Sequence, residues 1–432
     1  MGGTWKIQNK VRPGAYINIK GVPQNGFMAS ERGVGAIGLT LDWGLDDTCI
    51  EVFASDLLDG TATKKIGSVP LALEVMLSEC YKAVVYKLNA NGTKASASVG
   101  GLTVNAKCKG AMGNQLKVSI VANGSQYDVN TFLGADLVDS QTVSNGAELV
   151  ENDFVTFTGT TLSANAGTSL TSGANGSVTP STAYQNMFKK LKGADWNCLA
   201  IVSDKTTANP LAKAFVEDMR ENEGKKVQVA MNDTAYDYEG VIQSTQGFKT
   251  ASHEISAEIF PSFVAGVTAR ANFNESNTAY FIEGAESIVG EMTSAEIQTA
   301  LKGGQFVLSY ASDGAVKVEQ DINSLHTFTV LKGYTFSKNR VIRTLDEIAN
   351  TITSTFERFY MGKVSNNDAG RTNFKGDVVE YLNGLQVENA IENFSADDVD
   401  VQKGEAIDSV VVNLGIKPVD AIEKMYITIN VG

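Results

Sequence analysis

Histidine is almost absent from this chain of 432 residues, and the common signatures of catalysis are absent with it. His253 and His326 are the only histidines, and neither stands at metal-ligand spacing from a cysteine or a second histidine. The sequence has no G-x-S-x-G nucleophile motif and no phosphate-loop lysine. Because an enzyme of this size would normally carry such a constellation, we expect no catalytic residues, no cofactor and no metal site.

Cysteine is scarce, and no two cysteines form a C-x-x-C pair. The four thiols lie in apolar or strand-like contexts, where cysteine packs as a small hydrophobic residue. They are Cys49, Cys80, Cys108 and Cys198. We therefore expect reduced, buried thiols.

Long apolar runs and clustered positive charge are also lacking. No run approaches the roughly 18 apolar residues that cross a bilayer, and the start does not resemble a signal peptide. The chain has 36 Lys and Arg against 49 Asp and Glu, with a net charge of -13. Nucleic acids and anionic membranes attract clustered positive charge, so we expect neither partner and no membrane insertion. These features predict a soluble protein that folds in a cytoplasm.

Two short segments partly match the sequence patterns of ligand-binding sites. Residues 33–38 satisfy G-x-G-x-x-G, with Asp56 and Asp59 near the expected ribose distance, but no helix pattern opens on the glycines. We interpret 33–38 as a buried strand whose small residues allow close packing. The acidic run 397–400 could hold Ca²⁺, yet it lacks the ligand spacing of a calcium loop, so we favour a solvated loop.

The most informative stretch runs from Gly303 to Lys363. Alternating apolar residues on both sides of Asp313-Gly314 predict a hairpin, and a further β run is expected at 327–331. Apolar residues then recur every three or four positions over 341–359. This spacing predicts a long helix with one buried face and a polar opposite face.

Strand and helix signals on either side of a compositional break predict an α/β domain in two parts. Between residues 89 and 180 the chain is rich in Ser, Thr, Gly and Asn with period-two runs, which predicts a separate β-rich domain. The flanking signals are helices at 69–80, 184–191 and 210–221 and strands at 83–86, 198–202 and 227–231. Strand, helix and strand at this spacing indicate parallel crossovers. Further helices are expected at 263–271 and 378–385.

Short strand signals stand at both ends of the chain. A strand isolated at a terminus frays unless something tethers it. The front strand contains Tyr16, Ile17 and Ile19, and the back strand contains Tyr426, Ile427, Thr428, Ile429 and Val431. The front strand could be an edge strand of the first domain or an arm that pairs with another subunit.

Several segments resemble the tail sheath proteins of contractile phage tails and phage-tail-like particles, in the version found with Gram-positive hosts. They are GGTWKIQNKVRPGAYINIK (2–20), VEQDINSLHTFT (318–329), FSKNRVIRTLDEIANTI (336–352), GKVSNNDAGR (362–371) and KPVDAIEKMYITINVG (417–432). The resemblance covers both ends and most of the middle of the chain.

The residue patterns and this resemblance predict an α+β multi-domain fold. It comprises an α/β core domain with an inserted β-rich domain, an α+β C-terminal domain, and extended strand arms at both termini. The expected boundaries are 1–24 for the N-terminal arm, 25–88 and 183–302 for the two parts of the α/β domain, 89–182 for the outward insert, 303–417 for the C-terminal domain and 418–432 for the C-terminal arm.

The resemblance also implies a function. It implies a structural subunit that stacks as hexameric rings around an inner tube, exchanges arm strands with neighbours, and contracts to drive the tube through a cell envelope. The implied partners are other sheath subunits, the tube protein, and baseplate and terminator proteins, in a virion tail or similar particle assembled in the host cytoplasm. Lys338, Arg340, Arg343 and Arg371 are candidates for tube contact, with a solvated face or intrachain ion pairs as the alternative. A static tail tube or other lattice protein and a glycan-binding adhesin are the other functions that we retain.

Overall fold

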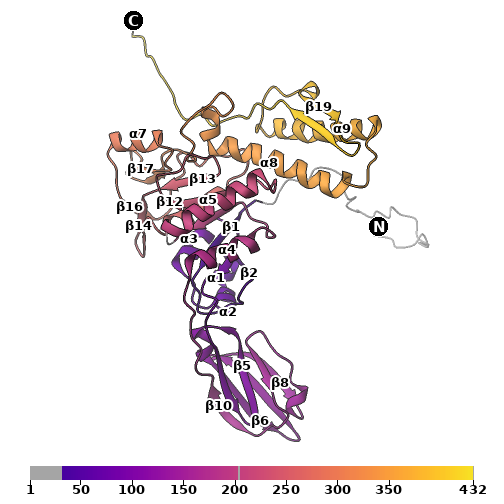
Figure 1. Cartoon of the computed structure of the whole chain (residues 1–432). Coiled ribbons are helices and arrows are strands. Elements are labelled where there is room, and N and C mark those ends of the chain that lie inside the picture. Colours follow the sequence, from indigo (N-terminus) through magenta and orange to yellow (C-terminus); the bar gives the residue numbers. More distant parts are fainter. Residues whose placement is uncertain (1–31, 203–204, 432) are drawn as a thin grey trace, which may run out of the picture.

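The computed structural model describes residues 32–202 and 205–431 (Figure 1). The expected front strand with Tyr16, Ile17 and Ile19 lies outside these residues. The described chain is a mixed α and β structure of several domains, which confirms the predicted fold class.

The centre of the molecule is one six-stranded sheet in the order β13-β12-β11-β1-β3-β2. Its strands are β1 (Val34–Leu39), β2 (Cys49–Phe53), β3 (Lys82–Lys87), β11 (Cys198–Ile201), β12 (Gln228–Asn232) and β13 (Val241–Ser244). All neighbours pair in parallel except β2, which is antiparallel to β3. Because β1 pairs with both β3 and β11, two distant parts of the chain complete a single sheet.

Helices cover both faces of this sheet. One face carries α1 (Ala54–Leu58), α2 (Thr61–Ile66), α3 (Leu71–Leu77) and α6 (Phe260–Arg270). The other face carries α4 (Pro180–Leu191) and α5 (Lys205–Glu221). The burial of Tyr184, Met187, Phe188 and Leu191 shows why α4 packs here, since these residues share one helical face.

The glycine-rich stretch 33–38 includes most of the central strand β1, whose six residues are all buried. A Cβ on Gly35 would lie 2.6 Å from Met76 Sδ, and one on Gly38 would lie 2.5 Å from Met187 Sδ. Because Gly35 and Gly38 have no side chain, α3 and α4 can pack closely against the two faces of the sheet. This packing confirms the interpretation of 33–38 as a buried strand.

The inserted domain is a sandwich of two antiparallel sheets around its own core, with the orders β4-β5-β9 and β10-β6-β7-β8. The strands are β4 (Lys94–Val99), β5 (Leu102–Lys109), β6 (Leu116–Asn123), β7 (Gln126–Leu133), β8 (Asp136–Val143), β9 (Val155–Thr158) and β10 (Asn165–Ser169), with 3₁₀ turns η1 (Ala111–Gln115) and η2 (Gly146–Glu148). Figure 1 shows the sandwich projecting from the body. We call the junction of sandwich and body the neck.

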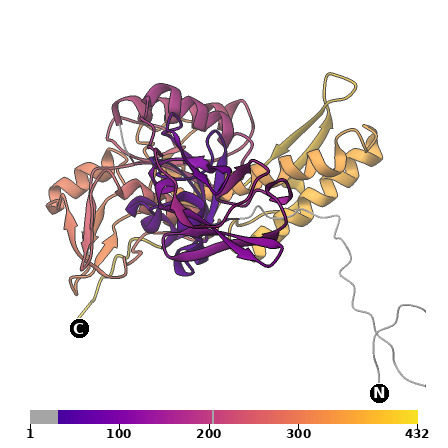
Figure 2. The same ribbon diagram turned by 90° about the horizontal axis from the view of Figure 1, so that it is seen from below.

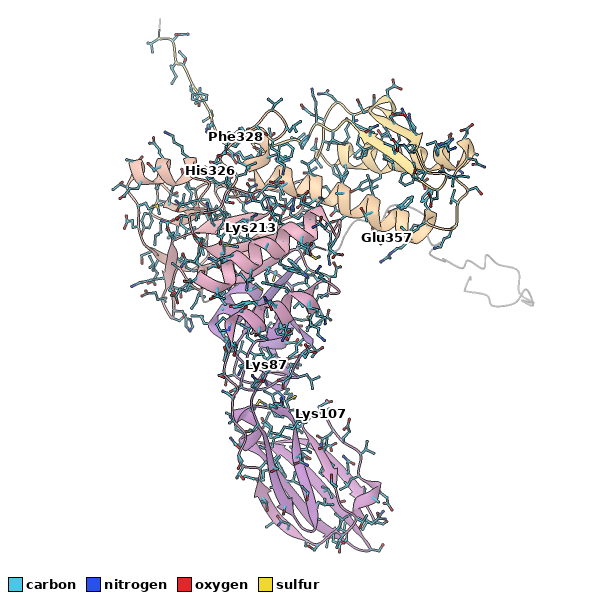
Figure 3. The ribbon with its side chains drawn as sticks, viewed as in Figure 1. Lys87, Lys107, Lys213, His326, Phe328 and Glu357 are labelled. Atoms are coloured by element: carbon cyan, nitrogen blue, oxygen red, sulfur yellow. The ribbon has the colours of Figure 1, made fainter. Side chains whose placement is uncertain are left out.

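Buried side chains connect the sandwich to the body at the neck. Trp43 is 1% exposed and lies in the sandwich core, with its ring centroid 6.3 Å from that of Phe154. The ammonium of Lys87 donates to the carbonyls of Lys109 at 2.7 Å and Gly44 at 3.2 Å. The carboxylate of Asp46 forms ion pairs with the ammonium groups of Lys87 and Lys109 (Figure 3 labels Lys87).

Smaller elements extend the body on one side. They are β14 (Gly247–Thr250), β15 (Glu254–Ile255), β16 (Ala285–Val289), α7 (Ser294–Lys302) and the hairpin of β17 (Leu308–Tyr310) and β18 (Val316–Val318). The hairpin turns at the predicted Asp313-Gly314, where Gly314 has a φ of 86°.

The C-terminal domain lies on the opposite side of the body from α7 (Figure 2). Its elements are η3 (Tyr334–Ser337), α8 (Asn339–Thr355), the π-helical turn η4 (Phe356–Tyr360), α9 (Asp368–Val387), η5 (Ala396–Asp398), β19 (Val399–Lys403) and β20 (Val410–Leu414). The long helix predicted over 341–359 is thus confirmed as α8 with η4. The acidic run 397–400 lies in η5 and the start of β19, where Asp398 accepts a bond from the backbone of Ser395.

Some expectations are wrong. Residues 327–331 form no strand and belong to no sheet of the described chain, and Phe328, Val330 and Leu331 are exposed. The polar side of α8, for which no burial was predicted, is largely buried, because Arg343 and Asp346 form ion pairs within the body. Helix α5 starts at Lys205, so Pro210 lies inside it, and α9 starts ten residues before the expected helix at 378–385.

Candidate assembly site at the C-terminal segment

The C-terminal segment leaves the body after a short antiparallel contact. Beyond β20, the amide of Glu392 donates to the carbonyl of Lys417, and the amide of Val419 donates to that of Ala390, both at 2.9 Å. An isolated bridge joins Ile391 and Pro418. These bonds carry the chain along the end of α9 to Asp420.

Glu423 anchors the root of this segment. Its carboxylate forms an ion pair with the ammonium of Lys338, which also lies 3.7 Å from Asp420. Thr278 Oγ1 donates to Glu423 at 2.7 Å and Gln320 Nε2 donates at 2.6 Å. Burial works against ionisation of Glu423, but these three donors outweigh it and lower the pKa below its ordinary value. The root is therefore fixed as a carboxylate.

The segment after Glu423 is extended and exposed. Tyr426 is 91% exposed, Ile429 81% and Val431 92%, and Met425 and Ile427 are exposed as well. In the described chain no backbone hydrogen bond involves residues 424–431. We call 424–431 the tail; Figure 1 shows it running away from the body. An extended segment with alternating apolar residues and unpaired backbone groups can pair as a strand with another chain.

The hairpin of β19 and β20 offers an edge that can accept a strand. The two strands form a two-stranded sheet, so each has an unpaired edge among the described residues. The bonds from Gly404 N to Ser409 O and from Gly415 N to Asp398 O show which residues of β20 direct their N–H and C=O groups toward β19. In an antiparallel pair every second residue points its N–H and C=O outward, which here selects Val410, Val412 and Leu414 of β20.

Buried ion pairs join α8 to the rest of the body. Arg343 donates to Asp321 at 2.7 Å, and the side chains are 2% and 0% exposed. Arg220 of α5 binds Asp346 of α8 through two bonds of 2.6 and 2.8 Å. Helix α8 is therefore connected to both α5 and the loop before η3.

The four basic candidates for tube contact all have intrachain partners. Lys338 and Arg343 are 3% and 1% exposed and belong to the ion pairs described above, which fits the alternative of intrachain pairing and leaves no exposed charge. Arg340 is half-buried beside the carbonyl of Asn389, and Arg371 pairs with Asp368. Tube contact by these last two stays a prediction.

Reactive side chains are dispersed. Cys80, Cys108 and Cys198 are buried and Cys49 is half-buried, and burial raises the pKa of Cys80 and Cys198 to about 12. Within the described residues, no group of three or more His, Cys, Asp or Glu could hold a metal ion. Nor does that part of the chain contain a helix long and apolar enough to cross a membrane.

The described chain is a multi-domain protein with an α/β body, an inserted β-sandwich, a C-terminal domain and an exposed tail. Residues 90–175 match the phage tail sheath β-sandwich domain, 178–324 the central domain and 332–432 the C-terminal domain of the same family. The phage-like element PBSX protein XkdK of Bacillus subtilis is 30% identical over 469 residues, covering 100% of this chain and 99% of that protein. The chain belongs to the phage tail sheath protein family.

Solved structures agree with this assignment. The sheath tail protein of Desulfitobacterium hafniense is 38% identical with a TM-score of 0.77, over 96% of this chain and 99% of that one. The anti-feeding prophage sheath in its contracted state is 11% identical with a TM-score of 0.59, over 97% and 98% of the two chains. The second likeness shows a shared fold.

Proposed function

We propose that this protein polymerises around an inner tail tube as stacked hexameric rings, joined by strand exchange, and contracts to drive the tube through a target cell envelope. The exposed, unpaired tail carries this proposal. Its partners are further copies of the chain, the tube protein, and baseplate and terminator proteins. The particle is a virion tail or a phage-tail-like particle, assembled in the host cytoplasm.

Strand exchange is supported by two complementary features of one chain. The tail has backbone donors and acceptors without partners, and β20 turns those of Val410, Val412 and Leu414 outward. Adding a strand to such an edge satisfies both sets of groups and buries apolar side chains. The donor and the acceptor lie in every copy, so the pairing can repeat along a lattice.

Contraction follows if the subunit bodies move as rigid units while paired strands keep them tethered. The body is held by the buried ion pair of Arg220 in α5 with Asp346 in α8, whereas residues 424–431 make no backbone hydrogen bond within the described chain. A difference of a few kcal/mol per subunit between two lattice states suffices for a large array to convert completely. Contracted relatives with the same fold support this reading.

The test removes the strand but keeps its anchor. A chain ending at Lys424 retains Glu423, so the body should fold with an unchanged unfolding midpoint. We expect it to form no cylinders by electron microscopy, whereas a full-length Thr428→Ser control forms them. Cylinders of normal length and normal shortening from the truncated chain would refute the proposal. Narrow rods that never shorten would instead indicate a static tube protein, and glycan-binding monomers an adhesin.

A further inference from the structure

An exposed apolar loop lies between β18 and α8. Val330 and Leu331 are 104% and 88% exposed, and the aromatic side chains of Phe328 and Tyr334 are 46% and 51% exposed. We call these four residues the crest. Single exposed apolar side chains are common on protein surfaces, but four on one loop indicate an interaction surface.

Hydrogen bonds and an ion pair hold the shape of this loop. At its tip the amide of Thr329 donates to the carbonyl of Lys332 at 2.9 Å, and the amide of Lys332 donates to Thr329 Oγ1 at 3.0 Å. At its start the amide of His326 donates to Asp237 at 2.7 Å, and Lys332 forms an ion pair with the buried Glu239. The two aromatic rings of the crest lie edge to face, 5.7 Å apart. A braced turn therefore presents the two aliphatic side chains of the crest to solvent.

The crest lies at the end of the body opposite the sandwich. Figure 3 labels Phe328 at this end, far from the neck residue Lys87. Phe328 and Tyr334 also line one cavity of about 670 Å³ together with Glu423, so the crest lies beside the root of the tail. We place the sandwich outward in the particle, and this end of the subunit then faces the particle axis.

The size of the crest favours one kind of partner. A stable interface between two proteins takes about 20–30 residues a side and buries about 800 Å² on each. Four side chains on one turn suit a smaller contact, which is weak in each subunit and strong when many subunits engage one partner together. Contacts between sheath copies have to persist while the subunits move, whereas a contact with the tube has to end. The crest therefore suits the tube.

We propose that the crest is the contact through which the uncontracted sheath holds the inner tube. Val330 and Leu331 of each subunit sit in an apolar hollow on the outer surface of the tube, and they leave it when the subunit bodies move outward. This inference rests on the function proposed above, and it adds the surface that meets the tube and the chemistry of the contact. The contact does not require Arg340 or Arg371.

The first experiment measures binding of subunits to tubes that have been stripped from purified particles. Leu331→Asp places a charge on the crest, and Leu58→Asp places the same charge on a leucine of α1 that is 92% exposed. Neither change should alter the unfolding midpoint, because both side chains lie in solvent. We expect Leu331→Asp to raise the half-saturating subunit concentration at least tenfold, and Leu58→Asp less than twofold, by electron microscopy of decorated tubes. Equal effects would overturn the inference.

The same variants without tubes test whether the crest joins sheath copies instead. We expect Leu331→Asp to self-assemble at the same subunit concentration as the wild type, by sedimentation. Self-assembly that needs an at least tenfold higher concentration would show that the crest binds a second copy of this chain, and it would overturn the inference.

The second experiment identifies the partner directly and does not depend on the aspartate variants. A photocrosslinker replaces Leu331 in purified particles, with the same crosslinker at Leu58 as control. Crosslinks from position 331 to the tube protein, at least tenfold fewer after contraction and absent from position 58, support the inference. Crosslinks to another sheath subunit overturn it, and so do crosslinks to the tube protein that are equally frequent in both states.

These outcomes are distinct from failure of the proposed function. If the chain ending at Lys424 assembles normally, strand exchange by the tail is wrong, whatever the crest contacts. If wild-type cylinders enclose a tube and shorten, but Leu331→Asp binds tubes as the wild type does, the proposed function stands and only the crest contact is wrong.

Discussion

The ion pair of Glu423 and Lys338 decides where the tail begins. Lys338 is almost fully buried, so its charge needs a partner that remains ionised. Glu423 fills that role, and Thr278 and Gln320 satisfy its other lone pairs. The residues on either side, Ile422 and Lys424, are exposed. The side chain of Glu423 thus marks the boundary between the anchored root and the exposed tail.

Glu423→Gln should free the root of the tail and destabilise the subunit. The change leaves Lys338 buried without its closest carboxylate, which costs about 1–3 kcal/mol in the free energy of unfolding. Urea unfolding at pH 7 measures this cost. Lys424→Gln, which removes an exposed neighbouring charge, is the control and should cost less than about 0.5 kcal/mol.

The same ion pair predicts how the difference in unfolding free energy between wild type and Glu423→Gln changes with pH. The pKa of Glu423 is lower in the folded chain than its ordinary value of 4.5, so its stabilising contribution is complete above that value. It is lost as the pH falls through the lowered folded pKa. The unfolding free energies of wild type and Glu423→Gln should therefore converge in acid. A gap that stays constant from pH 7 to below pH 4 would show that the carboxylate charge is not the cause.

At this scale the sequence shows the alternation of the tail, whose pairing as a strand stays a prediction, but it does not show the anchor of the tail. Tyr426 to Val431 alternate, and alternation is readable within a few residues. The partners of Lys338 lie at Thr278, Gln320 and Glu423, and no local pattern links positions so far apart. For the same reason the sequence left tube contact, a solvated face and intrachain ion pairs all open for Lys338 and Arg343, and only the fold shows the carboxylate that each of them pairs with.

Helix α8 joins the main parts of the body. Its apolar residues pack with α9 and the β19–β20 hairpin, and Asp346 on its polar side binds Arg220 of α5. Asn350 adds a pair of bonds to the backbone of Lys226. Helix α8 therefore packs in the core of the C-terminal domain and bonds to the α/β domain.

Arg220→Met should loosen this connection strongly. It leaves Asp346 buried without its bidentate partner, and breaking a buried pair from one side costs about 3–5 kcal/mol. Lys213→Met is the matched control on the same helix, since Lys213 pairs with Glu217 at the surface and such pairs contribute about 0.3–0.5 kcal/mol. Thermal unfolding of both variants tests the contrast. Similar midpoints would mean that the Arg220 pair does not hold α5 to α8.

Among the elements, regular patterns were predicted and irregular ones were not. The hairpin at Asp313-Gly314 and the apolar spacing of α8 follow from short-range rules. Residues 327–331 have β propensity but pair with no strand among the residues that the structure describes, so they form a loop there. The buried polar face of α8 depends on Arg220 and Asp321, which periodicity does not reveal.

For the whole molecule, the division of the α/β domain was predictable because the insert differs so clearly in composition. The neck was not, since it depends on single contacts such as Trp43 inside the sandwich core and Lys87 beneath it. The chain enters and leaves the sandwich at one place: Thr93 N donates to the carbonyl of Ala174 at 2.9 Å. The insert is therefore removable in principle without separating the flanking strands β3 and β11.

Replacing residues 93–174 by a Gly-Ser linker, together with Trp43→Ser, should leave a folded body. The six-stranded sheet takes no strand from the removed segment, and the serine avoids exposing the indole that the sandwich covered. Because the tail and β20 lie outside the insert, we expect cylinders to form. Their outer diameter should be smaller, since we place the sandwich outward. Circular dichroism checks the fold and electron microscopy the diameter, with the Trp43→Ser full-length chain as control. A folded body that forms no cylinders would mean that the sandwich carries lattice contacts, and an unchanged outer diameter would mean that it does not point outward.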